Sequence, residues 1–293
     1  MAGYVLVPLC TNCVLCWTRP TFAKRRTMKI GASTIPHRQS PLTRELLKVY
    51  VDAGIESLEL CDYHPNLDFD DAGFCGLVAD WLRELGLHLN SIHIHLRHRD
   101  PACDLASLES AQHQRAINAH LTAVDFAAEL GGCILVTHDI VIPEPGEPES
   151  VSRRAAFVEG IRAVGAHAEA GGVRLALENL GSGYTREPER LVSLLSEIDM
   201  SNVGAVIDTG HRHLSGDPGA ALRKVGEYLM TLHLHDNHGG KDEHLLCGRG
   251  AIDWVDVMQA LRDVGYDGVF MYEISRPEDL PALVENAQWI QGG

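Results

Sequence analysis

The 293-residue sequence has no apolar run long enough for a membrane-spanning helix and no glycine-rich dinucleotide-binding motif. A membrane span needs roughly 18 to 20 apolar residues, so we expect no membrane partner. The pattern GxGxxG, which a doubly wound open sheet presents after an early strand, is also missing. A doubly wound sheet is therefore the less favoured of the two α/β architectures considered below.

Positive charge is scarce. Lysine and arginine number 25 against 40 acidic residues, and the formal net charge is −15. An acidic body repels phosphate-rich polymers unless a basic groove or a bound metal reverses the local sign. Segments that combine basic and base-stacking residues are also lacking. We therefore expect no nucleic-acid partner.

The eight cysteines form no compact disulfide framework. Dispersed cysteines in a long chain indicate a reduced, cytoplasmic protein. Cys10, Cys13 and Cys16 have metal-like spacing, but no fourth ligand lies near them in the sequence. Residues 1–27 lack the charged start of a secretory signal, so we interpret them as a disordered extension or a wrongly assigned start.

From residue 28 onward, short β-branched or leucine-rich runs alternate with segments of helical periodicity. This alternation predicts βα units and a parallel sheet. The expected strands are 28–32, 56–61, 89–94, 133–137, 173–178, 203–208, 229–235 and 268–274. The expected helices are 41–53, 71–85, 107–130, 151–170, 186–197, 217–227, 253–264 and 277–290. Eight units in about 250 residues match a (β/α)₈ TIM barrel, so we predict a single barrel domain over 28–293.

Six of the expected strands end in a metal-type side chain: His93, His138, Glu178, Asp208, His233 and Glu273. In a (β/α)₈ barrel these strand ends open onto the active site. A carboxylate in an apolar strand costs several kcal/mol unless it is paired or bound to metal. Six such residues at matching positions indicate a shared cation. Glu59 in the second strand is a further, less certain acid.

Two local motifs strengthen this prediction. The segment DTGH places Asp208 and His211 three residues apart, just past a strand. A glycine-rich loop that follows His233 carries Asp242 and His244 and suits a tight fold over the barrel mouth. Mixed carboxylate and imidazole ligands favour Mn²⁺, Mg²⁺, Co²⁺ or Zn²⁺.

Over residues 28–290, the segments LALEN, VIDTGH, HLHDN…DEHLLCGRGAIDW and YEIS resemble the xylose-isomerase-like TIM-barrel superfamily, in particular its sugar-phosphate isomerase/epimerase branch. The resemblance implies one divalent metal with four protein ligands: Glu178, Asp208, His233 and Glu273. It further implies that the two glutamates move the substrate proton and that His211 contacts the substrate. Because related barrels often pair, we expect a homodimer.

The implied activity is isomerisation or epimerisation of a small sugar, sugar phosphate or related polyol ketone. The reaction would proceed by proton transfer through a metal-stabilised enediolate. A dehydratase on the same barrel is an alternative, since the same groups serve dehydration of a β-hydroxy ketone. Five loop cations are candidates for an anionic group but are more typical of solvated surface: Arg97, His98, Arg99, Arg212 and Arg249. Arg249 and His211 are the candidate substrate contacts.

The superfamily also contains the type-two AP endonucleases, which are DNA-repair phosphodiesterases with three zinc ions. Their nine ligands correspond here to His93, His138, Glu178, Asp208, His211, His233, Asp242, His244 and Glu273. The loop before Asp242 is short and glycine-rich, whereas the nucleases have a longer loop with serine and lysine. We therefore favour small-sugar chemistry, with the nuclease and a barrel that only binds a ligand as alternatives.

Overall fold

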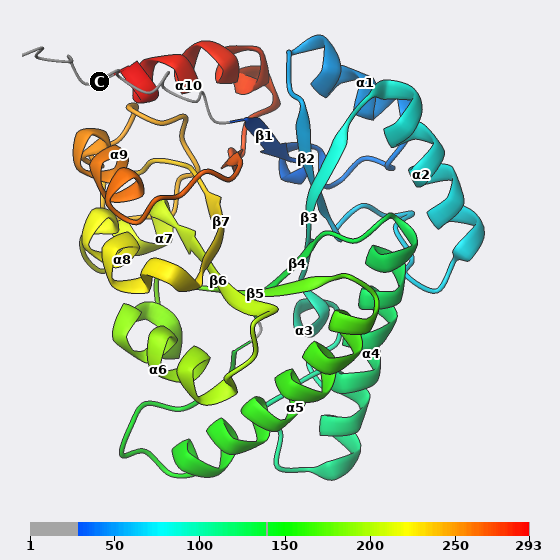
Figure 1. Cartoon of the computed structure of the whole chain (residues 1–293), viewed down its shortest axis with the longest axis vertical. Helices are drawn as coiled ribbons and strands as arrows, with labels where there is room; N and C mark the ends of the chain where they lie inside the picture. Colours follow the sequence, from blue (N-terminus) through cyan, green and yellow to red (C-terminus); the bar gives the residue numbers. More distant parts are fainter. Residues whose placement is uncertain (1–28, 139, 293) are drawn as a thin grey trace, which may run out of the picture.

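The computed structural model describes residues 29–138 and 140–292, and within them eight strands form the centre of the molecule with helices around them (Figure 1). All strand pairings are parallel, in the order β7-β6-β5-β4-β3-β2-β1-β8. The strands are β1 (Ile30–Ser33), β2 (Ser57–Cys61), β3 (His88–Ile94), β4 (Ile134–Thr137), β5 (Arg174–Glu178), β6 (Val203–Asp208), β7 (Leu229–His233) and β8 (Phe270–Tyr272).

The two end strands of this order, β7 and β8, meet just beyond the end of β7. Leu234 and Tyr272 form a parallel bridge, and the Leu234 backbone N–H donates to the Met271 carbonyl at 2.8 Å. The Glu273 N–H donates back to the Leu234 carbonyl at 3.1 Å. The sheet thus closes on itself, and the predicted (β/α)₈ barrel is confirmed.

The helices that surround the barrel follow the expected order. They are α1 (Arg44–Asp52), α2 (Ala72–Leu85), α3 (Leu96–Arg99), α4 (Ser110–Glu129), α5 (Ser150–Ala170), α6 (Pro188–Ile198), α7 (Thr209–His213), α8 (Pro218–Val225), α9 (Trp254–Asp263) and α10 (Leu283–Gly292). Four short 3₁₀ segments join them: η1 (Ile35–His37), η2 (Tyr184–Arg186), η3 (Gly226–Tyr228) and η4 (Pro277–Ala282).

The last expected helix, 277–290, needs correction because its first part is the 3₁₀ segment η4 and the α-helix begins only at Leu283. Pro281 lies within this stretch, and proline has no N–H to donate and collides with the preceding turn of an α-helix. The one-turn helices α3 and α7 were not predicted, since a single turn carries no periodic pattern.

Side-chain caps define where several helices begin. The Thr43 hydroxyl accepts from the Leu46 N–H at 3.1 Å before α1, and the Asp71 carboxylate accepts from the Phe74 N–H at 2.9 Å before α2. Asp217 and Asp253 cap α8 and α9 in the same manner. Such caps satisfy N–H groups that have no partner within the helix, and so they hold the loops between strand and helix in register.

The barrel interior contains a small apolar cluster with Ile134, Val136, Ala176 and Val206, from β4, β5 and β6. Successive side chains of a strand alternate between its two faces. Glu178 therefore lies on the same inward face as Ala176, and Asp208 on the same inward face as Val206. The apolar cluster thus closes the interior beneath the strand ends that carry the acids.

In the described part of the chain, no helix is both long and apolar enough to cross a bilayer. The segment 1–27, with Cys10, Cys13 and Cys16, lies outside the described residues. Its interpretation as an extension stays a prediction.

Candidate active site and metal centre

Four polar side chains converge at the C-terminal ends of the strands. Each offers one ligand atom, and these atoms lie within 4.8 Å of one another; the residues are Glu178, Asp208, His233 and Glu273. His233 Nδ1 lies 3.0 Å from Glu178 Oε1, 3.7 Å from a Glu273 oxygen and 4.0 Å from an Asp208 oxygen. All four side chains are buried. The structure thus brings together the four residues that the sequence proposes as ligands, and their metal-binding role stays a prediction.

The charges of this cluster shift the pKa of its members. Burial alone would lower the pKa of His233, but the carboxylates of Glu59, Glu273 and Glu178 raise it well above its ordinary value. Burial alone would raise the pKa of Glu178, but His233 and His93 hold it well below its usual range. Glu273 is shifted downward in the same way. Without a cation, the carboxylates therefore rely on imidazolium charge for compensation.

Several buried polar atoms here have no hydrogen-bond partner among the described residues: Glu59 Oε1, Glu178 Oε2, His93 Nε2 and His235 Nδ1. His93 Nε2 lies 3.0 Å from Glu178 Oε2, although the angles do not suit a hydrogen bond. Leaving buried polar atoms unpaired is costly. A divalent cation would satisfy such oxygen and nitrogen atoms, and the mixed donor set fits Mn²⁺, Mg²⁺, Co²⁺ or Zn²⁺.

His93 and His138 form a second group with His95, whose ligand atoms also lie within 4.8 Å of one another. His93 bridges the two groups, because its Nδ1 is 3.2 Å from Glu273 Oε1. Burial, together with the neighbouring His93, lowers the pKa of His138 to about 3, so this ring is neutral. Sequence reasoning missed His95, whose Nδ1 lies 2.8 Å from Asp62 Oδ1.

His211, Asp242 and His244 form a third group, together with His235. Asp242 Oδ2 lies 3.0 Å from His244 Nε2 and 3.4 Å from His211 Nε2. Burial would lower the pKa of both rings, but Asp208 and Asp242 raise that of His211 to about 12, and Asp242 and Glu273 raise that of His244 to about 9.

His235 is the second residue of this region that sequence reasoning missed. Its Nε2 lies 2.8 Å from Asp208 Oδ1, and its ring stacks on His244 with centroids 3.8 Å apart. The spacing in the segment HLH was the available signal. Residues two apart in an extended chain share a face, so His235 follows His233 toward the interior.

Asp236, also missed, holds the loop between β7 and α9. Its carboxylate accepts from the Gly248 N–H at 2.8 Å, the Ile252 N–H at 3.2 Å and the Trp254 indole N–H at 2.8 Å. Asp236 and Leu245 also pair through backbone hydrogen bonds in both directions. The loop that carries Asp242 and His244 is therefore folded around one buried carboxylate.

A cavity of about 540 Å³ opens at the same end of the barrel, between the segments that follow β3, β4 and β5. Its wall combines His138 with Arg97 and His98 and with apolar side chains such as Ile140 and Leu180. Among the clustered ligand-type residues, His138 lines this cavity.

Two of the other candidate cations, Arg212 and Arg249, contact other parts of the chain. Arg249 Nη1 lies 2.5 Å from Asp279 Oδ1, and Arg212 donates to the Arg186 carbonyl at 3.0 Å. Neither residue lines the cavity of about 540 Å³. Substrate contact by Arg249 thus stays a prediction without a supporting contact.

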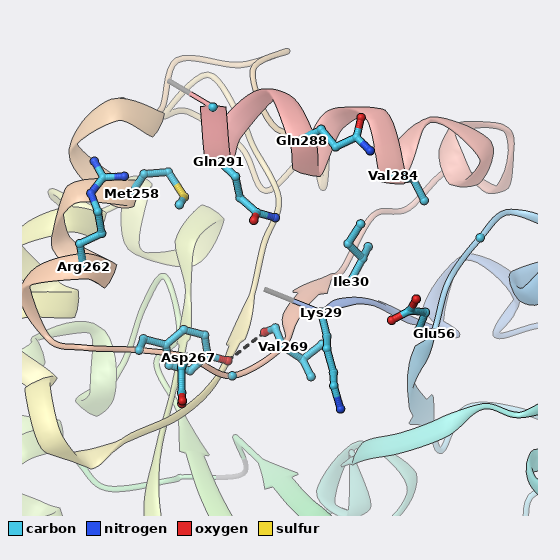
Figure 2. A pocket seen from close by; sticks show the side chains of 14 residues that line it. Lys29, Ile30, Glu56, Met258, Arg262, Asp267, Val269, Val284, Gln288 and Gln291 are labelled. Carbon is cyan, nitrogen blue, oxygen red and sulfur yellow. Dashed lines mark hydrogen bonds between the residues drawn. The ribbon is translucent and has the colours of Figure 1, made fainter. Parts of the chain in front are cut away.

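A larger cavity, of about 990 Å³, lies at the opposite end of the barrel (Figure 2). Its wall includes Lys29 and Ile30 at the start of β1, Val269 just before β8, and Arg262 and Gln288 of α9 and α10. It includes none of the clustered ligands described above. The smaller cavity, which His138 lines, is therefore the one of the two that adjoins the clustered ligand-type residues.

Comparison with known sequences identifies several relatives. An inosose isomerase from Bacillus licheniformis is 24% identical over 242 residues, which cover 76% of this chain and 84% of that protein. A D-psicose 3-epimerase from Ruminiclostridium cellulolyticum is 35% identical over 120 residues, 40% of this chain and 39% of the relative. An uncharacterized protein from Methanocaldococcus jannaschii is 31% identical over 186 residues, 59% of this chain and 62% of the relative. The last two alignments span less than two thirds of the relative's length.

Solved structures show the same fold. A D-tagatose 3-epimerase-like protein superposes with a TM-score of 0.77 at 22% identity, covering 90% of this chain and 98% of the other. D-psicose 3-epimerase from Clostridium cellulolyticum H10 gives a TM-score of 0.75 at 20% identity, covering 90% and 99%. The sequence model of the xylose isomerase-like TIM barrel matches residues 47–292. That match spans most of the sequence, and so the chain belongs to the xylose isomerase-like TIM-barrel family.

Proposed function

We propose that this protein is a divalent-metal-dependent isomerase or epimerase that acts on a small sugar, a sugar phosphate or a related polyol ketone. The observation that carries the proposal is the convergence of four buried ligand-type side chains at the barrel mouth: Glu178, Asp208, His233 and Glu273. The names of the relatives, which include D-psicose 3-epimerase and inosose isomerase, support a sugar-like substrate.

When bound by these four residues, a divalent cation would polarise the substrate carbonyl as a Lewis acid. The chain's own residues then move the proton. Glu178 approaches from the end of β5 and Glu273 from beyond β8, so they reach a substrate from different parts of the rim. One glutamate takes the proton α to the carbonyl, and the other returns a proton to the opposite face or to the neighbouring carbon.

The two glutamates are equipped for these roles. Glu178 Oε2 lies 3.0 Å from His93 Nε2 but accepts no hydrogen bond of suitable geometry from the described residues, which supports this atom as the proton acceptor. Histidine charge holds the pKa of both carboxyls low, and the ionised form is the one that can act as a base. His211 is the proposed contact for a substrate oxygen, and the 3.4 Å distance from its Nδ1 to Glu178 Oε1 supports this role.

The decisive experiment is a panel of ketoses and their phosphates in D₂O with the full-length protein, loaded in turn with Mn²⁺, Mg²⁺, Co²⁺ and Zn²⁺. Deuterium incorporation at the carbon next to the carbonyl, detected by NMR, would support proton transfer. Loss of water from the substrate would instead indicate the dehydratase. Binding without exchange would indicate a barrel that only holds a ligand, and would contradict the proposal.

A three-metal phosphodiesterase is the second candidate, because the other ligand-type residues form two further groups beside the first. Metal content separates the candidates. One exchangeable ion per chain supports the isomerase or epimerase, and three tightly held zinc ions support the nuclease. Incubation with duplex DNA that contains an abasic site provides the activity test. We expect no cleavage, since the net charge of −15 opposes DNA binding.

A further inference from the structure

Glu59 is a fully buried carboxylate in β2, two residues before the end of that strand. Its Oε2 accepts a hydrogen bond from Ser91 Oγ at 2.7 Å and lies 3.0 Å from His233 Nε2. A buried carboxylate is costly unless its partners compensate for the lost water. The contact with His233 is therefore part of what compensates the buried Glu59 carboxylate.

The His233 ring has two different surroundings. On one side, Nε2 faces Glu59, and on the other, Nδ1 faces Glu178 at 3.0 Å. A neutral imidazole has one N–H and one lone pair. If Nε2–H donates to Glu59, the lone pair of Nδ1 faces the carboxylate oxygens and is repelled by them. A cation bound by Nδ1 and these oxygens would attract both groups and remove the repulsion.

We infer that Glu59 is a positioning residue, which accepts the Nε2–H of His233 and so directs Nδ1 toward the cation. The inference rests on the metal centre of the proposed function. A metal-binding histidine commonly donates its second N–H to a carboxylate, which fixes the tautomer and the orientation of the ring. Ser91 in turn holds Glu59, since its hydroxyl donates to the same oxygen.

Asp62 provides a matched comparison within the same part of the chain. It directly follows β2, it is fully buried, and its Oδ1 lies 2.8 Å from His95 Nδ1. Asp62 is thus also a buried carboxylate in contact with an imidazole nitrogen. However, His95 is not one of the four converging residues, so loss of Asp62 should not affect the ligand that Glu59 positions.

The test compares Glu59→Leu, Glu59→Gln and Asp62→Val in the full-length, chelator-treated protein. Leucine removes the acceptor while keeping the volume, and glutamine keeps an oxygen that can accept. Affinity for Mn²⁺ and Co²⁺ is measured by calorimetric titration, and the visible spectrum of bound Co²⁺ reports on the ligand geometry.

We expect Glu59→Leu to weaken binding by about 10- to 100-fold and to alter the Co²⁺ spectrum. Glu59→Gln should recover much of the affinity, and Asp62→Val should bind as the wild type does.

Thermal unfolding of the metal-free variants establishes that each one folds. If Glu59→Leu does not fold, Ser91→Ala replaces it, because it removes the hydroxyl that holds Glu59 and should also weaken metal binding. Unchanged affinity and spectrum in Glu59→Leu would overturn the inference while leaving the proposed function intact. An equal loss in Asp62→Val would also overturn it, because the effect would then be a general one of removing a buried acid. If the wild type binds neither ion, the proposed metal-dependent function fails as well.

Discussion

The imidazole of His235 lies so close to Gly210 that a Cβ at position 210 would be 1.9 Å from the ring's Cε1. The same ring reaches Asp208, with Nε2 at 2.8 Å from Oδ1. Glycine at position 210 thus permits an approach that no other residue allows, and the approach orients one of the proposed ligands.

Gly210→Ala tests this relationship. The added methyl group would push the His235 ring away and break its contact with Asp208. We expect weaker Mn²⁺ binding and a loss of stability of about 1–3 kcal/mol, as overpacking typically causes. Metal titration and thermal unfolding measure both effects. Gly240→Ala is the control, because a Cβ at position 240 would meet no atom within 4 Å. Equal behaviour of the two variants would contradict the prediction.

Glu178→Gln and Glu273→Gln should leave substrate binding largely intact and prevent proton exchange with solvent. Proton transfer by a positioned side chain contributes roughly 10²- to 10⁴-fold to a rate, so we expect losses at least in this range. Deuterium incorporation into a substrate identified in the panel is the measurement. Glu189→Gln, on the exposed surface of α6, is the control. Full exchange in both active-site variants would reject the assignment of these glutamates.

Removal of metal should make stability fall as pH rises. In the metal-free protein, the carboxylates around them raise the pKa of His93 to about 10 and that of His244 to about 9, above the ordinary histidine value of about 6.5. Between pH 6.5 and these raised pKa values, the folded state therefore binds more protons than the unfolded state. The stabilisation is complete below pH 6.5 and is lost as the pH rises through about 9 to 10.

Melting temperatures from pH 6 to 10, with and without a chelator, measure this effect. Bound Mn²⁺ should weaken the decline, because metal binding displaces these protons and becomes tighter as pH rises. A chelator-treated protein that melts at higher temperature as pH increases over this range would be inconsistent with the shifted pKa values.

Asp236→Ala should destabilise the whole protein, because four N–H donors would lose their acceptor: the backbone groups of Asn237, Gly248 and Ile252 and the indole of Trp254. We expect a loss of roughly 3 kcal/mol or more, since each hydrogen bond to a charged group contributes about 1.5–3 kcal/mol. Asp253→Ala is the control, since it removes only the cap of α9 and should cost about 1 kcal/mol. Chemical denaturation compares the two. A smaller loss in Asp236→Ala than in Asp253→Ala would show that the loop is held by other contacts.

The barrel and its rim were predictable because both depend on simple periodicities. The alternation of strand and helix gave the order of elements, and the position of Glu178 and Asp208 at the ends of expected strands placed both residues at the C-terminal rim. The less regular parts were not predictable in this way. The HLH spacing indicates that His235 shares a face with His233, but β7 ends at His233, and no spacing in the sequence indicates that the Asp236 carboxylate accepts hydrogen bonds from the loop before α9.

Pairs formed by different strands were also beyond the sequence. The sequence indicated Glu59 as a further acid of the site, but its partner His233 is 174 positions away. Only the closed sheet brings the two side chains together. The same holds for Asp62 and His95, which the folding of β2 beside β3 places in contact. Spacing along a chain indicates which residues share a face, whereas it carries no information on which faces meet.

The four proposed ligands lie at or directly after the ends of β5, β6, β7 and β8, whereas the wall of the adjoining cavity comes from the segments that follow β3, β4 and β5. Under the proposed function, recognition would fall to these segments and proton transfer to the glutamates, with His138 common to the cavity wall and the ligand-type groups. An insertion or exchange in those three segments would remodel the contour offered to a ligand without moving the charged interior. A scaffold divided in this way can acquire new substrates through loop changes alone, while its reaction stays the same.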